Sequence, residues 1–177
     1  MKKTPRPFAY APADFIPFRD RAVIERIRKI KRADITKHRN PEFQISVIPD
    51  ADVEFLWMTE MFARIKTAME ADQPLVMIMP NPWPNYRKLA FLINKFRVDC
   101  RRLHTFNMDE YANEKGEIAP ESWEFGFMHA FKKYFWSQID PKLRPPEKNI
   151  QGPTDRNIKD YGRMIAELGG ADICYSG

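Results

Sequence analysis

Two adjacent acids, Asp109 and Glu110, come directly after a segment that favours extended structure. Residues 103–106 include side chains that are common in β-strands, and polar residues begin abruptly at Asn107. In an open parallel sheet, ligands bind just beyond the carboxyl ends of the strands. Carboxylates at that position can accept and return protons, which makes Asp109 and Glu110 candidate catalytic residues. The alternative, which the spacing by itself favours, is a strand that runs into a solvated acidic loop.

A second candidate segment, residues 80–88, follows a continuous apolar run at residues 75–79. That run is bounded by prolines and predicts a strand that is buried on both faces. Five side chains of the segment are candidate substrate-binding residues: Asn81, Trp83, Asn85, Arg87 and Lys88. Trp83 would form an apolar or stacking wall for a ligand, and the two basic residues would supply positive charge. The alternative is a rigid Pro-rich turn that binds no ligand.

Apolar runs alternate with helical periods along most of the chain. Strands are expected at residues 43–48, 75–79, 103–108 and 171–175, and helices at residues 53–69, 86–96, 123–135 and 158–168. This alternation predicts an α/β fold with a doubly wound, mostly parallel sheet flanked by helices. The carboxyl ends of parallel strands meet at one edge, so we expect both candidate segments to lie there. The aromatic residues at helical spacing in residues 123–135 are expected to belong to the core.

The net charge of +5 is concentrated near the N-terminus. Residues 19–39 contain nine Lys or Arg residues against three acids, and residues 1–18 are rich in Pro and aromatic side chains. We expect residues 1–42 to form an arm that includes a short basic helix and contacts another subunit in a homo-oligomer. A basic arm can also bind nucleic acid, but a solvated helix face or a subunit contact is the more common role of such a segment.

The two cysteines, Cys100 and Cys174, are too few for a disulfide framework, and neither has metal-ligand spacing to a histidine. We expect both to be reduced thiols, as in a cytoplasmic protein. The sequence contains neither an apolar run of membrane-spanning length nor the apolar core of a signal peptide. A membrane partner is therefore not expected.

The run Thr-Phe-Asn-Met-Asp-Glu-Tyr at residues 105–111 is followed by Pro-Glu-Ser-Trp at residues 120–123 and by an aromatic helix. Together these features resemble the glucosamine-6-phosphate deaminase family, whose fold is shared with 6-phosphogluconolactonase and ribose-5-phosphate isomerase. The resemblance extends over roughly residues 43–177. It implies that Asp109 is the base that takes the proton from C2 of an open-chain amino sugar, with Glu110 assisting or orienting it. It implies neither a metal nor an organic cofactor.

The sequence departs from the family at two places. The family has a Gly- and Ser/Thr-rich turn that holds the sugar phosphate through backbone N–H groups, whereas residues 80–85 contain no Gly, Ser or Thr and include three prolines. Arg87 and Lys88 could supply charge but not the same cradle. The family's later Asp, His and Glu would follow Gly177, where this sequence ends. Residues 43–177 are thus expected to be the N-terminal part of such a domain, apparently truncated after its last strand.

Two functions are compatible with these observations. The preferred interpretation is an enzyme of carbohydrate metabolism that isomerises or deaminates a sugar, such as an amino-sugar phosphate, by removing a proton next to a carbonyl. The alternative is a non-catalytic sugar-sensing or regulatory module on the same fold. In both cases the expected partner is a small sugar or sugar phosphate. A nucleic-acid clamp formed by the basic arm is the least expected function.

Overall fold

The computed structural model describes residues 19–176, so the expected Pro/aromatic segment at residues 1–18 lies outside the described residues. The chain divides into two units, residues 1–49 and residues 50–177. Each unit is described by itself below. In the described part of the chain, no helix combines the length and the apolar character that crossing a membrane requires.

The first unit contains the expected basic helix, α1 (Arg21–Arg28), followed by the short 3-10 helix η1 (Arg32–Asp34). The side chain of Asp20 caps α1 by accepting a hydrogen bond from the backbone N–H of Val23 at 3.1 Å. No residue of α1 is buried.

The prediction of a strand at residues 43–48 is wrong, because this segment forms a turn and loop. Phe43 and Val47 are 57% and 60% exposed. Apolar and β-branched residues favour a strand only where a neighbouring strand pairs with them and one face is covered. Within the described residues, neither condition is met here.

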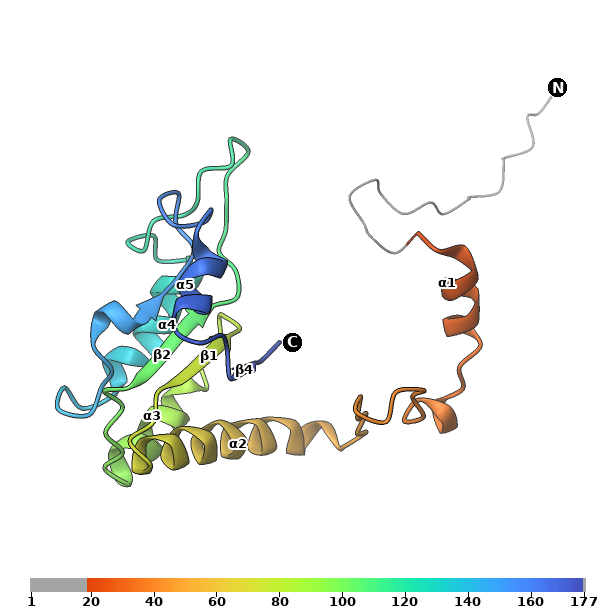
Figure 1. Cartoon of the computed structure of the whole chain (residues 1–177), viewed down its shortest axis with the longest axis horizontal. Helices are drawn as coiled ribbons and strands as arrows, with labels where there is room; N and C mark the ends of the chain where they lie inside the picture. Colours follow the sequence, from red (N-terminus) through yellow and green to blue (C-terminus); the bar gives the residue numbers. More distant parts are fainter. Residues whose placement is uncertain (1–18, 177) are drawn as a thin grey trace. The chain divides into compact units, whose positions relative to one another are not determined.

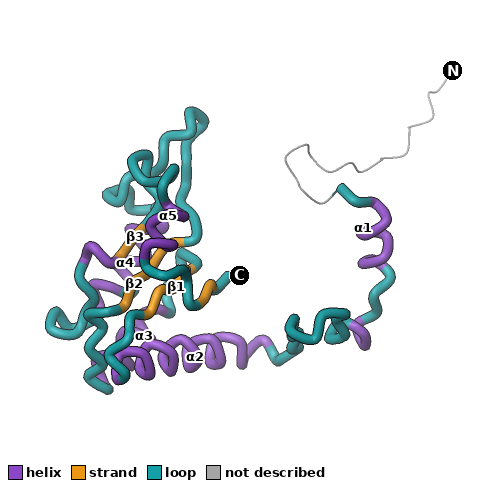
Figure 2. Tube along the Cα trace, in the orientation of Figure 1, coloured by secondary structure: helices purple, strands orange, loops and turns teal. Residues whose placement is uncertain are grey.

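The second unit is an α/β domain with a four-stranded parallel sheet, as the sequence predicts (Figure 1). The strands are β1 (Leu75–Met79), β2 (Leu103–Asn107), β3 (Ile150–Gln151) and β4 (Ile173–Cys174), in the spatial order β3-β2-β1-β4. The helices are α2 (Asp50–Glu70), α3 (Tyr86–Lys95), α4 (Phe127–Tyr134) and α5 (Tyr161–Glu167), with the 3-10 helices η2 (Trp136–Gln138) and η3 (Glu147–Asn149). Figure 2 shows the strands side by side in orange.

Helices cover both faces of this sheet. Leu75, Met77 and Met79 of β1 belong to one core with buried residues of α2, α3 and α4. Phe106 alternates with the core residue Leu103 along β2, so it faces the opposite side. There its ring meets the ring of Tyr161 from α5, with centroids 5.5 Å apart. Two helix layers around a parallel sheet are the doubly wound arrangement.

Aromatic residues connect α3 to α4. The ring of Tyr86 at the start of α3 is fully buried and meets Phe131 of α4 edge to face, with centroids 5.5 Å apart. Phe131 and Phe135 are both buried, which confirms the expected core role for this part of the aromatic stripe. Trp123 was expected on the same helix but lies before it and is 41% exposed. The segment around it forms turns, closed by a hydrogen bond from the Trp123 N–H to the carbonyl of Pro120 at 2.9 Å.

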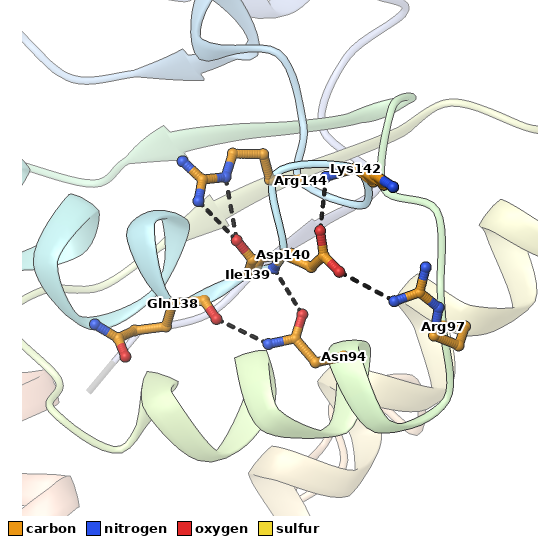
Figure 3. A network of polar contacts seen from close by, with 7 residues as sticks. All are labelled: Asn94, Arg97, Gln138, Ile139, Asp140, Lys142 and Arg144. Carbon is orange, nitrogen blue, oxygen red and sulfur yellow. Dashed lines mark hydrogen bonds and ion pairs between the residues drawn. The ribbon is translucent and has the colours of Figure 1, made fainter.

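A polar network holds the segment after η2 against the end of α3 (Figure 3). Asn94 donates to the carbonyl of Gln138 at 2.8 Å, and its side-chain oxygen accepts from the backbone N–H of Asp140 at 2.8 Å. Arg97 forms an ion pair with Asp140 at 3.0 Å. The backbone N–H of Lys142 and the Arg97 guanidinium lower the pKa of Asp140. The network therefore fixes the start of the segment that leads to β3.

Candidate functional site

The acidic loop (residues 107–111) and the Pro-rich segment (residues 80–88) lie at the same edge of the sheet, as expected. β1 and β2 are parallel, and Met79 is the register partner of Asn107. Beyond this pair, the backbone N–H of Met108 donates to the carbonyl of Met79 at 3.0 Å. The loop that carries Asp109 therefore leaves β2 beside the residues that leave β1.

Two asparagines connect these loops. Asn81 donates through Nδ2 to Oδ1 of Asn107 at 3.0 Å, and Asn107 is only 1% exposed. The hydroxyl of Tyr161 lies 2.9 Å from the backbone carbonyl of Asn107 and 3.2 Å from that of Gln151. The end of β2 is thus held from β1 on one side and from α5 on the other. The peptide bond from Asn81 to the next residue, Pro82, is cis.

Asp109 has a pKa above the ordinary value of an aspartate. Asp109 is an exposed residue, but its carboxyl group is partly buried. This burial, followed by the negative charge of Glu110, raises the pKa of Asp109. A raised pKa brings a carboxylate closer to the working range of a general base at neutral pH. The direction of this shift agrees with the role that the sequence predicts for Asp109.

Glu110 is oriented quite differently from Asp109. Its Oε1 atom accepts from the backbone N–H of Phe127 at 2.8 Å and from that of Tyr111 at 3.0 Å, while Oε2 accepts from the N–H of Met128 at 2.8 Å. Phe127 and Met128 are the first two residues of α4, whose N-terminal N–H groups lack partners inside the helix. Glu110 therefore attaches the acidic loop to α4, which fits an orienting role better than proton transfer.

Trp83, which was expected to form a sugar-stacking wall, packs against α2. Its ring stacks on that of Trp57 from α2, with centroids 4.5 Å apart and an angle of 28° between the planes. It also meets Tyr86 edge to face at 4.8 Å. One face of Trp83 is thus covered by Trp57, and the residue is half-buried.

The three remaining candidates also contact protein groups. Asn85 donates to Oε2 of Glu54 at 2.7 Å, and Lys88 forms an ion pair with Oε1 of the same carboxylate. The guanidinium of Arg87 lies over the ring of Tyr134, 4.7 Å from its centroid. The fold already uses the polar groups that the sequence suggests for substrate binding.

An open groove of about 420 Å³ begins at Tyr111, two residues after Asp109. It is lined by Tyr111, Ala112, Asn113, Glu117, Ile118, Ala119, Pro120 and Trp123. The rings of Tyr111 and Trp123 meet edge to face with centroids 5.6 Å apart. The structure therefore places a concave, partly aromatic surface close to Asp109, in a segment that the sequence does not single out for binding.

Sequence reasoning also missed Glu54 and Tyr161. Glu54 lies on α2, 31 residues before its partner Asn85, and Tyr161 lies 54 residues after Asn107. Only the three-dimensional arrangement brings such pairs together, so no local signal could have identified them. Among residues 19–176, no three His, Cys, Asp or Glu side chains come together in a way that could hold a metal ion.

Curated relatives of the chain are glucosamine-6-phosphate deaminases. The protein of Histophilus somni is 33% identical over 125 residues, which cover 62% of this chain and 44% of that protein. The protein of Porphyromonas gingivalis is 29% identical over 143 residues, 76% of this chain and 52% of that protein. The protein of Halothermothrix orenii is 30% identical over 88 residues, 50% of this chain and 35% of that protein. The chain thus spans about half the length of these relatives, or less.

No family model matches the sequence. The fold resembles the solved structure of a monomeric glucosamine-6-phosphate deaminase of the NagB superfamily, with a TM-score of 0.52 and 18% identity. This similarity covers 66% of this chain and 49% of that one, and it supports the α/β fold. The sequence relatives agree with the resemblance that residues 105–111 indicate, and the chain is similar in sequence to glucosamine-6-phosphate deaminases.

Proposed function

We propose that this protein acts on an amino sugar or a closely related sugar, by removing a proton from the carbon next to its carbonyl group. The observation that carries the proposal is the position of Asp109, directly after the carboxyl end of β2 and beside the loop that follows β1. The raised pKa of Asp109 supports it. The curated relatives named as glucosamine-6-phosphate deaminases support the substrate class.

In this proposal, the ionised carboxylate of Asp109 accepts the proton from C2 of the open-chain sugar. The electrons of the C–H bond form a C1–C2 double bond, and the carbonyl oxygen takes up the negative charge. The C1 oxygen takes up a proton from water, and in an amino sugar the return of a proton to C1 leaves a protonated imine at C2, which water hydrolyses to the ketone with release of ammonia. In a sugar with a hydroxyl group at C2, the same proton transfer gives the ketone directly. Glu110 orients the loop that carries Asp109 through its hydrogen bonds to α4. The proposed opposite wall consists of Asn81, Trp83 and Asn85 in the loop after β1, with Arg87 and Lys88 in the first turn of α3.

A non-catalytic sugar-sensing or regulatory module is the second candidate. The contacts of the loop after β1 favour it, because Trp83, Asn85 and Lys88 are already engaged with α2. A module of this kind would bind the sugar without exchanging its C2 proton. Proton exchange is therefore the measurement that separates the two candidates.

We further propose a domain organisation, a subunit contact and a cellular location for the protein. We keep the division into an arm at residues 1–42 and a deaminase/isomerase-like domain at residues 43–177, with the arm joining subunits of a homo-oligomer. The exposed side chains of Ile27 and Ile30 in the basic segment support such a contact. Cys100 and Cys174 carry free thiols, which supports a cytoplasmic location. Binding of nucleic acid is not part of the proposal.

The test is solvent-deuterium exchange at C2 of glucosamine and of glucosamine 6-phosphate, followed by proton NMR in the presence of the longest natural form of the protein. We expect exchange that depends on protein concentration. Binding of the sugar without any exchange would support the sensing module instead.

A further inference from the structure

A negatively charged side chain of the protein itself lies at the start of α3. The N-terminal end of a helix attracts negative charge, because its first N–H groups point outward and the helix dipole is positive there. In this chain the carboxylate of Glu54, from α2, lies at that position. One oxygen accepts from the side chain of Asn85, the residue that precedes α3, at 2.7 Å, and the other pairs with Lys88 in the first turn.

The backbone around the start of α3 offers little to an external anion. The N–H groups of Tyr86, Arg87 and Lys88 donate to the carbonyls of Trp83, Pro84 and Asn85, at 3.1, 3.3 and 2.8 Å. The prolines at positions 80, 82 and 84 have no N–H group. Both the backbone donors and the nearby ammonium group are therefore used within the protein.

A second residue of α2 reinforces this closure. Trp57 lies three residues after Glu54, so both side chains project from the same side of α2. Trp57 stacks on Trp83 while Glu54 binds Asn85 and Lys88. The helix α2 thus contacts the loop after β1 through the ring of Trp57 and the start of α3 through the carboxylate of Glu54.

We propose that Glu54 determines substrate specificity by excluding phosphate from the N-terminal end of α3, so that the protein takes an unphosphorylated sugar at this edge of the sheet. A phosphate group at this position would meet the negative charge of Glu54 and would have to displace it from Lys88. The inference rests on the proposed function, since it names the substrate class of the same site.

The test compares the binding of inorganic phosphate to the wild-type chain, Glu54→Gln, Glu54→Ala and a matched control by calorimetry at low salt. Glu60→Gln is the control, because Glu60 lies on the same helix but pairs with Arg64 at 2.9 Å instead of with a residue of α3. We expect weak phosphate binding to the wild type and to the control. Both Glu54 variants should bind phosphate about 10-fold more tightly, because they remove a repulsive charge and release Lys88.

A further substitution assigns the site. Adding Lys88→Met to Glu54→Gln should remove the gained affinity for phosphate. In the single Glu54 variants, but not in the wild type, glucosamine 6-phosphate should bind more tightly than glucosamine. Unchanged phosphate binding in both Glu54 variants, or tight binding by the wild type, would overturn the proposal. Because phosphate binding needs no turnover, an absence of C2 proton exchange would count against the proposed function without affecting this result.

Discussion

The Oε2 atom of Glu110 accepts a hydrogen bond from the backbone N–H of Met128 at 2.8 Å, which attaches the loop after β2 to the first turn of α4. The other oxygen of the carboxylate binds the N–H of Phe127 at 2.8 Å. The neighbouring acid, Asp109, has an exposed side chain and a raised pKa. Two acids that look alike in the sequence therefore have different surroundings: Glu110 is an anchor, and Asp109 is the acid that we propose as the base.

The anchor predicts a loss of stability in Glu110→Gln. The amide has one acceptor oxygen in place of two, so at least one N–H group of α4 loses its partner. We expect the free energy of unfolding to fall by about 1–3 kcal/mol. Urea denaturation followed by circular dichroism measures it, with Glu114→Gln in the exposed turn nearby as the control, expected within about 0.5 kcal/mol of the wild type. Equal stability of the two variants would show that the anchor contributes little.

The same substitution should change the titration of Asp109. The charge of Glu110 is one of the causes that raise the pKa of this carboxyl, although burial contributes more. Glu110→Gln should therefore lower the pKa of Asp109, because the neutral amide no longer disfavours its ionised form. Carbon-detected NMR of the Asp109 carboxyl over a pH series gives the pKa directly. A pKa that stays the same or rises would exclude electrostatic coupling between the two acids.

The raised pKa of Asp109 also predicts how stability depends on pH. The folded state holds this proton more tightly than the unfolded chain, so the contribution of the group is most favourable below the unfolded pKa, about 3.9. That contribution is lost as the pH rises through the folded pKa. Asp109→Asn cannot ionise, so its stability relative to the wild type should increase between about pH 3 and about pH 7. Urea denaturation at several pH values tests this, and a relative decrease would contradict the direction of the shift.

The stack of Trp83 on Trp57 predicts a structural role for Trp83. Replacing it by Ala removes the contacts to Trp57 and Tyr86, and we expect a loss of about 1–3 kcal/mol in the free energy of unfolding. Trp83→Phe keeps an aromatic ring and should lose less. A Trp83 side chain that served only as a sugar platform would leave stability nearly unchanged in both variants. Chemical denaturation distinguishes these outcomes.

The strand β1 could be predicted because it is a continuous apolar run bounded by prolines. The strand β2 could be predicted because it contains residues that favour extended structure and polar residues follow it. The strand β3 could not, since its two residues carry no pattern and are defined only by pairing with β2. For residues 43–48 the sequence has strand-like side chains, but among residues 19–176 no strand pairs with them. Parallel strand geometry predicts that the segments after β1 and β2 lie at one edge of the sheet. The contacts of Glu54 with α3 cannot be predicted in this way, because they depend on how α2 packs.

The most direct test of catalysis is Asp109→Asn. The amide has nearly the same shape as the carboxylate but cannot accept the C2 proton, so sugar binding should be retained while exchange of that proton is lost. General-base catalysis of this kind contributes about 10²–10⁴-fold in rate, and we expect C2 deuterium exchange to slow by that factor. Glu114→Gln should exchange at the wild-type rate. Exchange that continues undiminished in Asp109→Asn would remove Asp109 from the mechanism and leave the carboxyl edge of β2 as a binding surface.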